Sequence, residues 1–212
     1  MPSSDTTGQQ VLARDPDARL MLQVGRDEPG AFEQLVERYQ HRLVAVLERA
    51  VRRPELAEDL AQEVFLRVYR SRKSYRPKAK FSTWLFTIAN NLALNALRDR
   101  GRSPEVSLNV RESGPLGPRP AEQLAKAESG EMPDRNVVRA ELQQVVQAAI
   151  DSLNERQRMA VMLNKFEDMG YAEIGEVMGL SPMAVKSLLA RARSHLREAL
   201  EPYLRQGQWP AI

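Results

Sequence analysis

Residues 171–193 read YAEIGEVMGLSPMAVKSLLARAR, and this stretch decides the class of fold that the chain adopts. Apolar residues recur at intervals of three and four on both sides of Gly179, which predicts two short helices joined by a tight turn. Ser181 is a suitable N-cap for the second helix, and Pro182 suits its first position. Two short helices across such a turn are typical of a helix-turn-helix that places its second helix in the major groove of DNA.

The second helix of this pair has two distinct faces. Val185, Leu189 and Ala192 share one face and predict a stripe that packs on the core. Polar, basic and small side chains lie opposite and could let the helix approach bases and phosphates. These candidate DNA contacts are Lys186, Ser187, Ala190, Arg191 and Arg193. The plainer alternative is a solvated surface helix.

Helical periodicity also dominates the rest of the chain. We expect helices over about 29–51, from Pro54 to about residue 70, over 81–100, and over 136–166 in two segments. Glycine and proline crowd residues 101–135, which predicts a flexible linker. The expected fold class is therefore all-α, with two small helical domains at 26–100 and 136–205, and with residues 1–25 as an N-terminal tail.

Composition limits the chemistry that the chain can support. It has 212 residues, no cysteine and two histidines, so disulfides are excluded and a metal site is not expected. We find no phosphate-binding glycine loop, no pairing of a nucleophile with a base, and no cofactor motif. The N-terminus lacks a signal-peptide pattern, and no segment is apolar enough for membrane insertion, so we expect a cytoplasmic protein.

Charge is distributed unevenly along the first domain. Residues 67–102 hold ten basic side chains and one acid, Asp99, whereas residues 55–63 are acidic. A basic block beside an acidic one suggests a polyanion and a second, different partner. On the acidic helix Asp59, Gln62 and Glu63 face away from the apolar stripe. This face could dock a protein partner or could simply be solvated; no histidine lies near enough in sequence to favour catalysis.

The segment 81–100, FSTWLFTIANNLALNALRDR, combines aromatic and amide side chains. Asn91 and Asn95 are one helical turn apart and share a face. Amides can read base edges, and Tyr75 and Trp84 could stack on a single strand. The alternative is that Trp84 belongs to the core and the amides are ordinary polar surface.

These segments, in this order, resemble a bacterial RNA polymerase sigma factor of the extracytoplasmic-function (ECF) group. AEDLAQEVFLRVYR is similar to the core-polymerase-binding helix of that family, and residues 81–100 to its promoter-melting helix. Residues 171–193 are similar to its C-terminal helix-turn-helix. The resemblance implies sigma domains 2 and 4, and a non-enzymatic protein that binds core RNA polymerase and promoter DNA, both duplex and melted non-template strand.

The resemblance also assigns roles to individual residues. It implies polymerase binding by Asp59, Gln62, Glu63 and Phe65. It implies contacts with the minus 10 element by Tyr75, Arg76, Lys78, Lys80, Trp84, Asn91 and Asn95, the first two enclosing a flipped base. It implies contacts with the minus 35 element by Lys186, Ser187, Ala190, Arg191 and Arg193. An anti-sigma factor is a further expected partner.

This chain departs from the family pattern at a few positions. Leu188 and Ala190 stand where the family often has larger polar or aromatic side chains, so we expect them to set the minus 35 preference. Gly175 replaces a usual alanine, at a cost of about 1 kcal/mol to its helix. Two other functions stay open on the residues alone: a helix-turn-helix regulator that does not dock on polymerase, and an enzyme with a helical nucleic-acid-binding tail.

Overall fold

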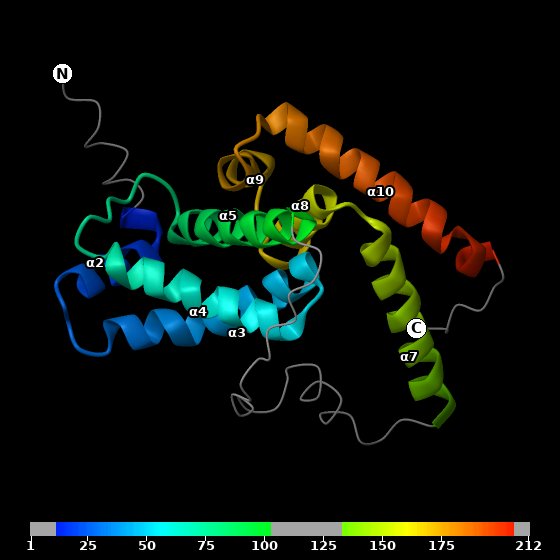
Figure 1. Ribbon diagram of the computed structural model, residues 1–212, viewed down its shortest axis with the longest axis horizontal. Helices are drawn as coiled ribbons and strands as arrows, with labels where there is room; N and C mark the ends of the chain where they lie inside the picture. The colour runs from blue at the N-terminus through cyan, green and yellow to red at the C-terminus, as the bar shows by residue number, and fades with distance from the viewer. Residues whose placement is uncertain (1–11, 103–132, 206–212) are drawn as a thin grey trace.

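The computed structural model describes residues 12–102 and 133–205, and every regular element within them is a helix (Figure 1). An all-α fold is therefore confirmed for this part of the chain. The elements are α2 (Pro16–Gly25), α3 (Ala31–Val51), α4 (Pro54–Arg70), α5 (Phe81–Arg102), α7 (Pro133–Ser152), α8 (Glu155–Phe166), α9 (Tyr171–Met178) and α10 (Pro182–Arg205).

Helices α2 to α5 form the first domain. The expected helices at 29–51 and from Pro54 are confirmed, and their apolar stripes, such as Leu35, Leu43 and Leu47 on α3, are fully buried. Helix α5 continues through Gly101 to Arg102 instead of ending before the glycine. The expected linker falls mostly outside the described residues, as does any helix near residues 121–128.

The expected N-terminal tail is wrong for residues 16–25. They form α2, whose Ala18, Met21 and Val24 are buried against α3 and α5. Asp15 caps this helix by accepting a hydrogen bond from the Asp17 amide at 3.0 Å. The pair Asp15-Pro16 is an N-cap followed by proline, which is a start signal that the sequence carried.

Helices α7 to α10 form the second domain, with α9 and α10 as the helix-turn-helix. Asn154 and Gln157 make reciprocal capping bonds at the start of α8. Ser181 Oγ accepts from the Ala184 amide at 3.2 Å and caps α10, which begins at Pro182 as expected. Gly179 adopts a positive φ of 65°, and this allows the tight turn between α9 and α10.

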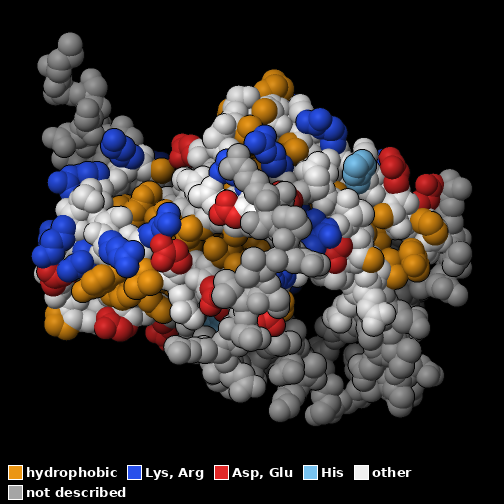
Figure 2. All heavy atoms as spheres, in the orientation of Figure 1, with side chains coloured by type: hydrophobic (Ala, Val, Ile, Leu, Met, Phe, Trp, Pro, Cys, Tyr) orange, Lys and Arg blue, Asp and Glu red, His pale blue; other side chains and the backbone are white. Residues whose placement is uncertain are grey.

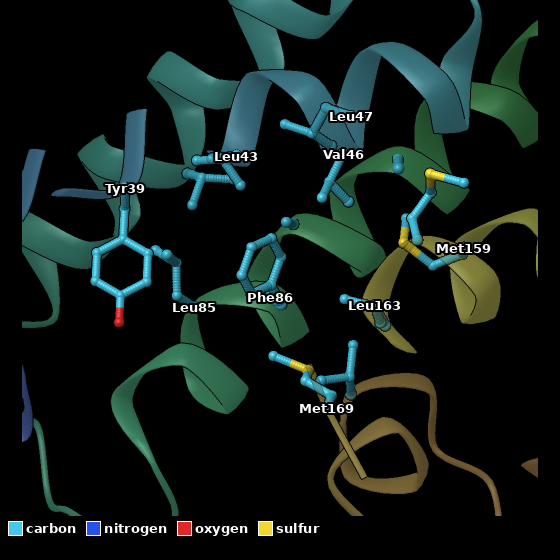
Figure 3. Close-up of a cluster of buried hydrophobic side chains, with 14 of the residues drawn as sticks. Tyr39, Leu43, Val46, Leu47, Leu85, Phe86, Met159, Leu163 and Met169 are labelled. Atoms are coloured by element: carbon cyan, nitrogen blue, oxygen red, sulfur yellow. The ribbon is translucent and has the colours of Figure 1, made fainter. Parts of the chain in front are cut away.

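The two domains share one hydrophobic core. Figure 3 shows Phe86 of α5 between Leu43 and Val46 of α3 on one side and Leu163 and Met169 on the other. All five side chains are at most 3% exposed. Separation of the domains would therefore expose a substantial apolar surface.

Polar contacts tie the domains together around this core. Arg158 of α8 is 4% exposed and donates to the carbonyls of Ala50 at 3.1 Å, at the end of α3, and of Leu153 at 2.6 Å. Arg42 of α3 and Glu167, after α8, form an ion pair at 2.5 Å. The described chain is thus in a closed arrangement, with α8 and α9 packed on the first domain.

Candidate nucleic-acid interface

A cavity of about 480 Å³ opens between the α4–α5 loop, the start of α5 and helix α9. This volume lies within the range of small-molecule binding pockets. Its lining residues are Ser71, Ser74, Tyr75, Arg76, Lys78, Ala79, Thr83, Trp84, Thr87 and Glu176. The cavity thus brings together four of the residues expected to contact the minus 10 element, since Tyr75, Arg76, Lys78 and Trp84 all line it.

Aromatic rings build the apolar wall of the cavity. The rings of Tyr75 and Trp84 lie 4.8 Å apart with a 53° tilt, and Phe81 contacts both. Tyr75 is 5% exposed, so it serves as wall rather than as a free stacking platform, whereas Trp84 is half-buried. The two alternatives for Trp84 therefore combine, because it packs on the core and also faces the cavity.

Two residues that line the cavity have buried hydroxyl groups without a partner. Within the described residues neither Tyr75 Oη nor Thr83 Oγ1 makes a hydrogen bond. Burial raises the pKa of Tyr75, and the nearby Asp15 carboxylate raises it further, so the phenol stays protonated. Such buried groups cost free energy when they are unpaired. Thr83 was not among the expected site residues, because its burial is not visible in the sequence.

Asp15 fixes the start of α5 beside the cavity. Its second oxygen accepts from the Phe81 amide at 2.6 Å, while the first caps α2. Asp17 in turn accepts from Tyr39 Oη at 2.6 Å, and Tyr39 packs on Phe81. This bond could not be predicted from the cap signal alone, because it joins residues that are 66 positions apart.

Amide side chains on α5 divide between two environments. Asn91 and Asn95 are exposed, and Asn95 Oδ1 accepts from Arg98. Helical spacing aligns them with Thr87 and Trp84, so the cavity and these amides lie along one face of α5. Asn90 instead is buried and donates to the Val177 carbonyl of α9 at 3.3 Å.

Basic side chains surround this face. Figure 2 shows Lys and Arg gathered at the end of the molecule where α2, the end of α4 and the α4–α5 loop lie. Lys80 pairs with Glu173 of α9 at 2.8 Å. Partial burial raises the pKa of Glu173, but the bonds from Lys80 and the Gly170 amide outweigh this and hold the pKa below its usual value.

The expected polymerase-binding face lies on the outside of α4. Asp59 and Gln62 are exposed, while Glu63 pairs with Arg67 at 2.8 Å within the helix. Phe65 is half-buried and packs edge-on against Phe32 at 6.5 Å. Sequence reasoning missed the neighbouring exposed residues Leu66 and Tyr69, which are 49% and 41% exposed and extend this acidic face with an apolar patch.

The expected DNA-reading face of α10 is open to solvent. Lys186, Ser187, Ala190, Arg191 and Arg193 are all exposed. Leu188 is different, because it is only 9% exposed and belongs to the core cluster. The expectation that its side chain sets minus 35 preference is therefore wrong: position 188 lies three residues after Val185 and shares the buried stripe.

Gly175 lies where α9 closes on the turn. A Cβ at this position would lie 2.6 Å from the Leu180 carbonyl oxygen, and the Leu180 amide bonds back to the Gly175 carbonyl at 2.9 Å. The glycine therefore permits a close backbone approach that outweighs its expected helix cost.

Family models and relatives identify both domains. The model of sigma-70 region 2 matches residues 35–103, and that of sigma-70 region 4 matches residues 143–196. The chain is 34% identical over 197 residues to the RNA polymerase sigma-H factor of Pseudomonas aeruginosa, covering 93% of this chain and all of that one. It is 32% identical over 196 residues to the ECF RNA polymerase sigma-E factor of Escherichia coli K12, covering 90% and 97%.

Solved structures agree with this result. CnrH, in complex with the cytosolic domain of CnrY, matches with a TM-score of 0.63 and 23% identity, over 89% of this chain and 99% of that one. The sigma factor RpoE of Bartonella quintana, in complex with the anti-sigma factor NepR, matches with a TM-score of 0.60 and 25% identity, over 81% and 98%. At 23% identity, the match to CnrH supports the fold alone.

The fold and these matches thus define a transcription initiation factor with two sigma domains. The chain belongs to the ECF family of RNA polymerase sigma factors, with sigma-70 regions 2 and 4. It directs promoter recognition by RNA polymerase and is not an enzyme. A helix-turn-helix regulator would leave the region 2 match unexplained. Within residues 12–102 and 133–205, no helix is long and apolar enough to cross a membrane.

Proposed function

We propose that this sigma factor captures one unpaired base of the non-template strand in the cavity beside Trp84. The observation that carries the proposal is the cavity itself, whose wall holds the half-buried Trp84 beside Tyr75, with the two rings 4.8 Å apart and tilted by 53°. A nucleobase offers a π-face to the half-buried Trp84. Base capture would offset the cost of unstacking, which is a few kcal/mol.

The neighbouring residues then hold the strand on either side of that base. Arg76, Lys78 and Lys80 bind phosphates, and Asn91 and Asn95 read the minus 10 bases that follow along α5. This assignment is supported by the face of α5 that Asn91 and Asn95 share, and by the basic side chains near it. The minus 10 domain comprises residues 26–100 together with α2.

The second domain, residues 136–205, binds duplex DNA at the minus 35 element. Lys186, Arg191 and Arg193 supply base or phosphate contacts, and the exposed Ser187 and Ala190 leave room for the groove. Core polymerase docks on the outer face of α4 through Asp59, Gln62 and Phe65, beside the exposed Leu66 and Tyr69. Glu63 also contacts the polymerase, once its ion pair with Arg67 is broken.

This sigma factor works in the cytoplasm under the control of an anti-sigma factor. The support for such a partner is that the Bartonella quintana sigma factor, of similar fold, is in complex with the anti-sigma factor NepR. The partner of this chain would hold the two domains in an inactive arrangement until a signal releases them.

Transcription in vitro tests the proposed roles. Core RNA polymerase of Pseudomonas aeruginosa and this chain are incubated with a genomic promoter library, and run-off transcripts are sequenced. Trp84→Ala should reduce open-complex formation at the promoters found, while Trp84→Phe, the matched control, should retain most of it. Equal activity of Trp84→Ala and the unmodified chain would refute base capture at this cavity.

A further inference from the structure

The loop between α4 and α5, residues 71–80, carries Tyr75 and the basic residues that we assign to the captured base and its phosphates. Figure 1 shows this loop at the same end of the molecule as α2. One backbone bond orders its start, because the Arg72 amide donates to the Tyr69 carbonyl at 3.1 Å. Residues 73–80, which all lie in the described part of the chain, form no helix or strand. The position of the loop relative to Trp84 therefore depends on the contacts that hold it.

The start of the loop is held by a carboxylate that follows α2. Asp27 pairs with Arg72 at 2.8 Å and with Lys73 at 2.9 Å. The Arg72 side chain is only 20% exposed, and its guanidinium lies over the Tyr69 ring, 3.9 Å from the centroid. Bonds from Lys73 and Arg72 hold the pKa of Asp27 below its usual value, so the carboxylate is charged at neutral pH.

The backbone of α2 also approaches the start of the loop. A Cβ at Gly25, the last residue of α2, would lie 2.7 Å from the Arg72 carbonyl oxygen, so only glycine allows this approach without a shift of the loop. Asp27 has a positive φ of 57°, and its amide donates to the Val24 carbonyl at 3.0 Å. The turn that directs the Asp27 carboxylate is therefore continuous with the end of α2.

The far end of the loop is held from the other end of the same helix. Asp15, before α2, accepts from the amide of Phe81, directly after the loop. Helix α2 itself is fixed, because its buried face packs on α3 and α5. Residues 15–27 thus hold both ends of the loop from one rigid element.

We infer that residues 15–27 form a brace that sets the position of the α4–α5 loop for base capture, with Gly25 and Asp27 as positioning residues. This inference rests on the proposed base capture and adds the residues that position its loop. Asp27 acts through Arg72 and Lys73. Exposed ion pairs add little stability, whereas an error of about 1 Å in position can lower the rate of a step strongly. Loss of the brace should therefore impair capture more than folding.

Asp27→Asn tests the brace with little change of shape. Asparagine has the same size and tolerates the left-handed conformation, but it removes the charge that holds both cations. Glu28→Gln is the matched control, since this neighbouring carboxylate pairs with Arg26 at 3.7 Å and its loss changes the net charge equally. Gly25→Ala is a second, uncharged variant that displaces the start of the loop.

Open-complex formation is measured with core polymerase on a promoter that this sigma factor directs, with 2-aminopurine at the position that responds to Trp84→Ala. Asp27→Asn and Gly25→Ala should each reduce the signal at this position about fivefold, the upper range for loss of an exposed ion pair. Assembly with core and the signal of Glu28→Gln should stay unchanged. An equal reduction in Glu28→Gln and Asp27→Asn would show an effect of charge alone and overturn the inference.

A double-mutant comparison tests whether Asp27 acts through its two cations. In a background that carries Arg72→Gln and Lys73→Gln, addition of Asp27→Asn should have no further effect, because the pairs are already absent. The same fivefold reduction in this background would overturn the proposed route from Asp27 to the loop.

Hydrogen exchange of the free chain gives a readout that does not depend on DNA. In Asp27→Asn and Gly25→Ala the amides of Arg72 and Ser74, which bond within the start of the loop, should exchange faster, while those of α3 keep their rates. Glu28→Gln should match the unmodified chain. Unchanged exchange at the start of the loop in both variants would overturn the brace.

The Trp84→Ala variant separates this inference from base capture. If Trp84→Ala abolishes the 2-aminopurine signal but Asp27→Asn and Gly25→Ala leave it intact, base capture stands and the brace is refuted. If Trp84→Ala leaves the signal at every position unaltered, base capture is refuted and the brace falls with it.

Discussion

Asp15 accepts a hydrogen bond from the backbone amide of Phe81 at 2.6 Å, and this bond joins the start of α2 to the start of α5. The same carboxylate caps α2, so one buried side chain satisfies the first amides of two helices. Tyr75 and Trp84, which line the cavity, both contact the Phe81 ring. The position of the cavity wall thus depends on a residue that precedes the region 2 match.

Loss of this carboxylate should weaken the first domain. Asp15→Ala removes the cap of α2 and leaves the buried Phe81 amide unpaired, so we expect a loss of about 2–4 kcal/mol in the free energy of unfolding. Urea denaturation followed by circular dichroism gives the value. Asp15→Asn, which keeps one acceptor oxygen, should lose less. A loss below about 0.5 kcal/mol for Asp15→Ala would contradict the bridging role.

Reversal of charge at Asp59 should abolish binding to core polymerase. Asp59→Arg adds a long cation to the exposed face of α4, where no described neighbour depends on the aspartate, so the fold should remain intact. Co-purification with core polymerase reports the loss, and single-stranded DNA binding should stay unchanged. Glu37→Arg, at an exposed position on α3, is the matched control. Normal assembly of Asp59→Arg with core would refute this docking face.

Truncation of Arg191 should weaken binding at the minus 35 element by about 1–3 kcal/mol while core docking is retained. Its guanidinium is exposed and bonds only weakly to the Ser187 carbonyl, at 3.4 Å, so the substitution costs little stability. Electrophoretic shifts of holoenzyme on promoters with and without the minus 35 sequence measure the effect. An equal loss of affinity on both kinds of promoter would show that Arg191 contacts a phosphate and does not read a base.

Substitution of Gly175 by alanine should destabilise the helix-turn-helix despite the higher helix propensity of alanine. The added methyl group would lie 2.6 Å from the backbone oxygen of Leu180, so the turn must shift. We expect a loss of about 1–3 kcal/mol in the free energy of unfolding, as for other overpacked sites. A thermal melt that shows equal or greater stability would contradict this reading.

The helices could be predicted because each one repeats its own apolar pattern. Val64 and Val68 on α4, or Val185 and Leu189 on α10, are buried as the spacing indicates. Leu188 was misjudged because it lies at the edge of the buried stripe, where spacing alone does not distinguish a buried side chain from a DNA-facing one. The helix at residues 16–25 was not predicted, because its cap signal, Asp15-Pro16, follows a polar N-terminal segment.

Contacts between the domains could not be predicted from local patterns. Asn90 and Asn91 are adjacent amides, yet the first binds a carbonyl 87 residues away and the second is exposed. The Arg42–Glu167 pair spans 125 residues. Such pairs depend on how whole helices pack, so one sequence without its fold does not reveal them. The candidate strand contacts were found by resemblance, but their cavity was found only in the structure.

The most direct test of base capture is the fluorescence of 2-aminopurine placed singly along the minus 10 element of the non-template strand, at a promoter that this sigma factor directs. In complexes with core polymerase we predict that one position differs sharply from its neighbours, and that Trp84→Ala abolishes this difference while Trp84→Phe preserves it. A uniform change at every position, or a profile that Trp84→Ala leaves unaltered, would contradict capture of a base beside Trp84.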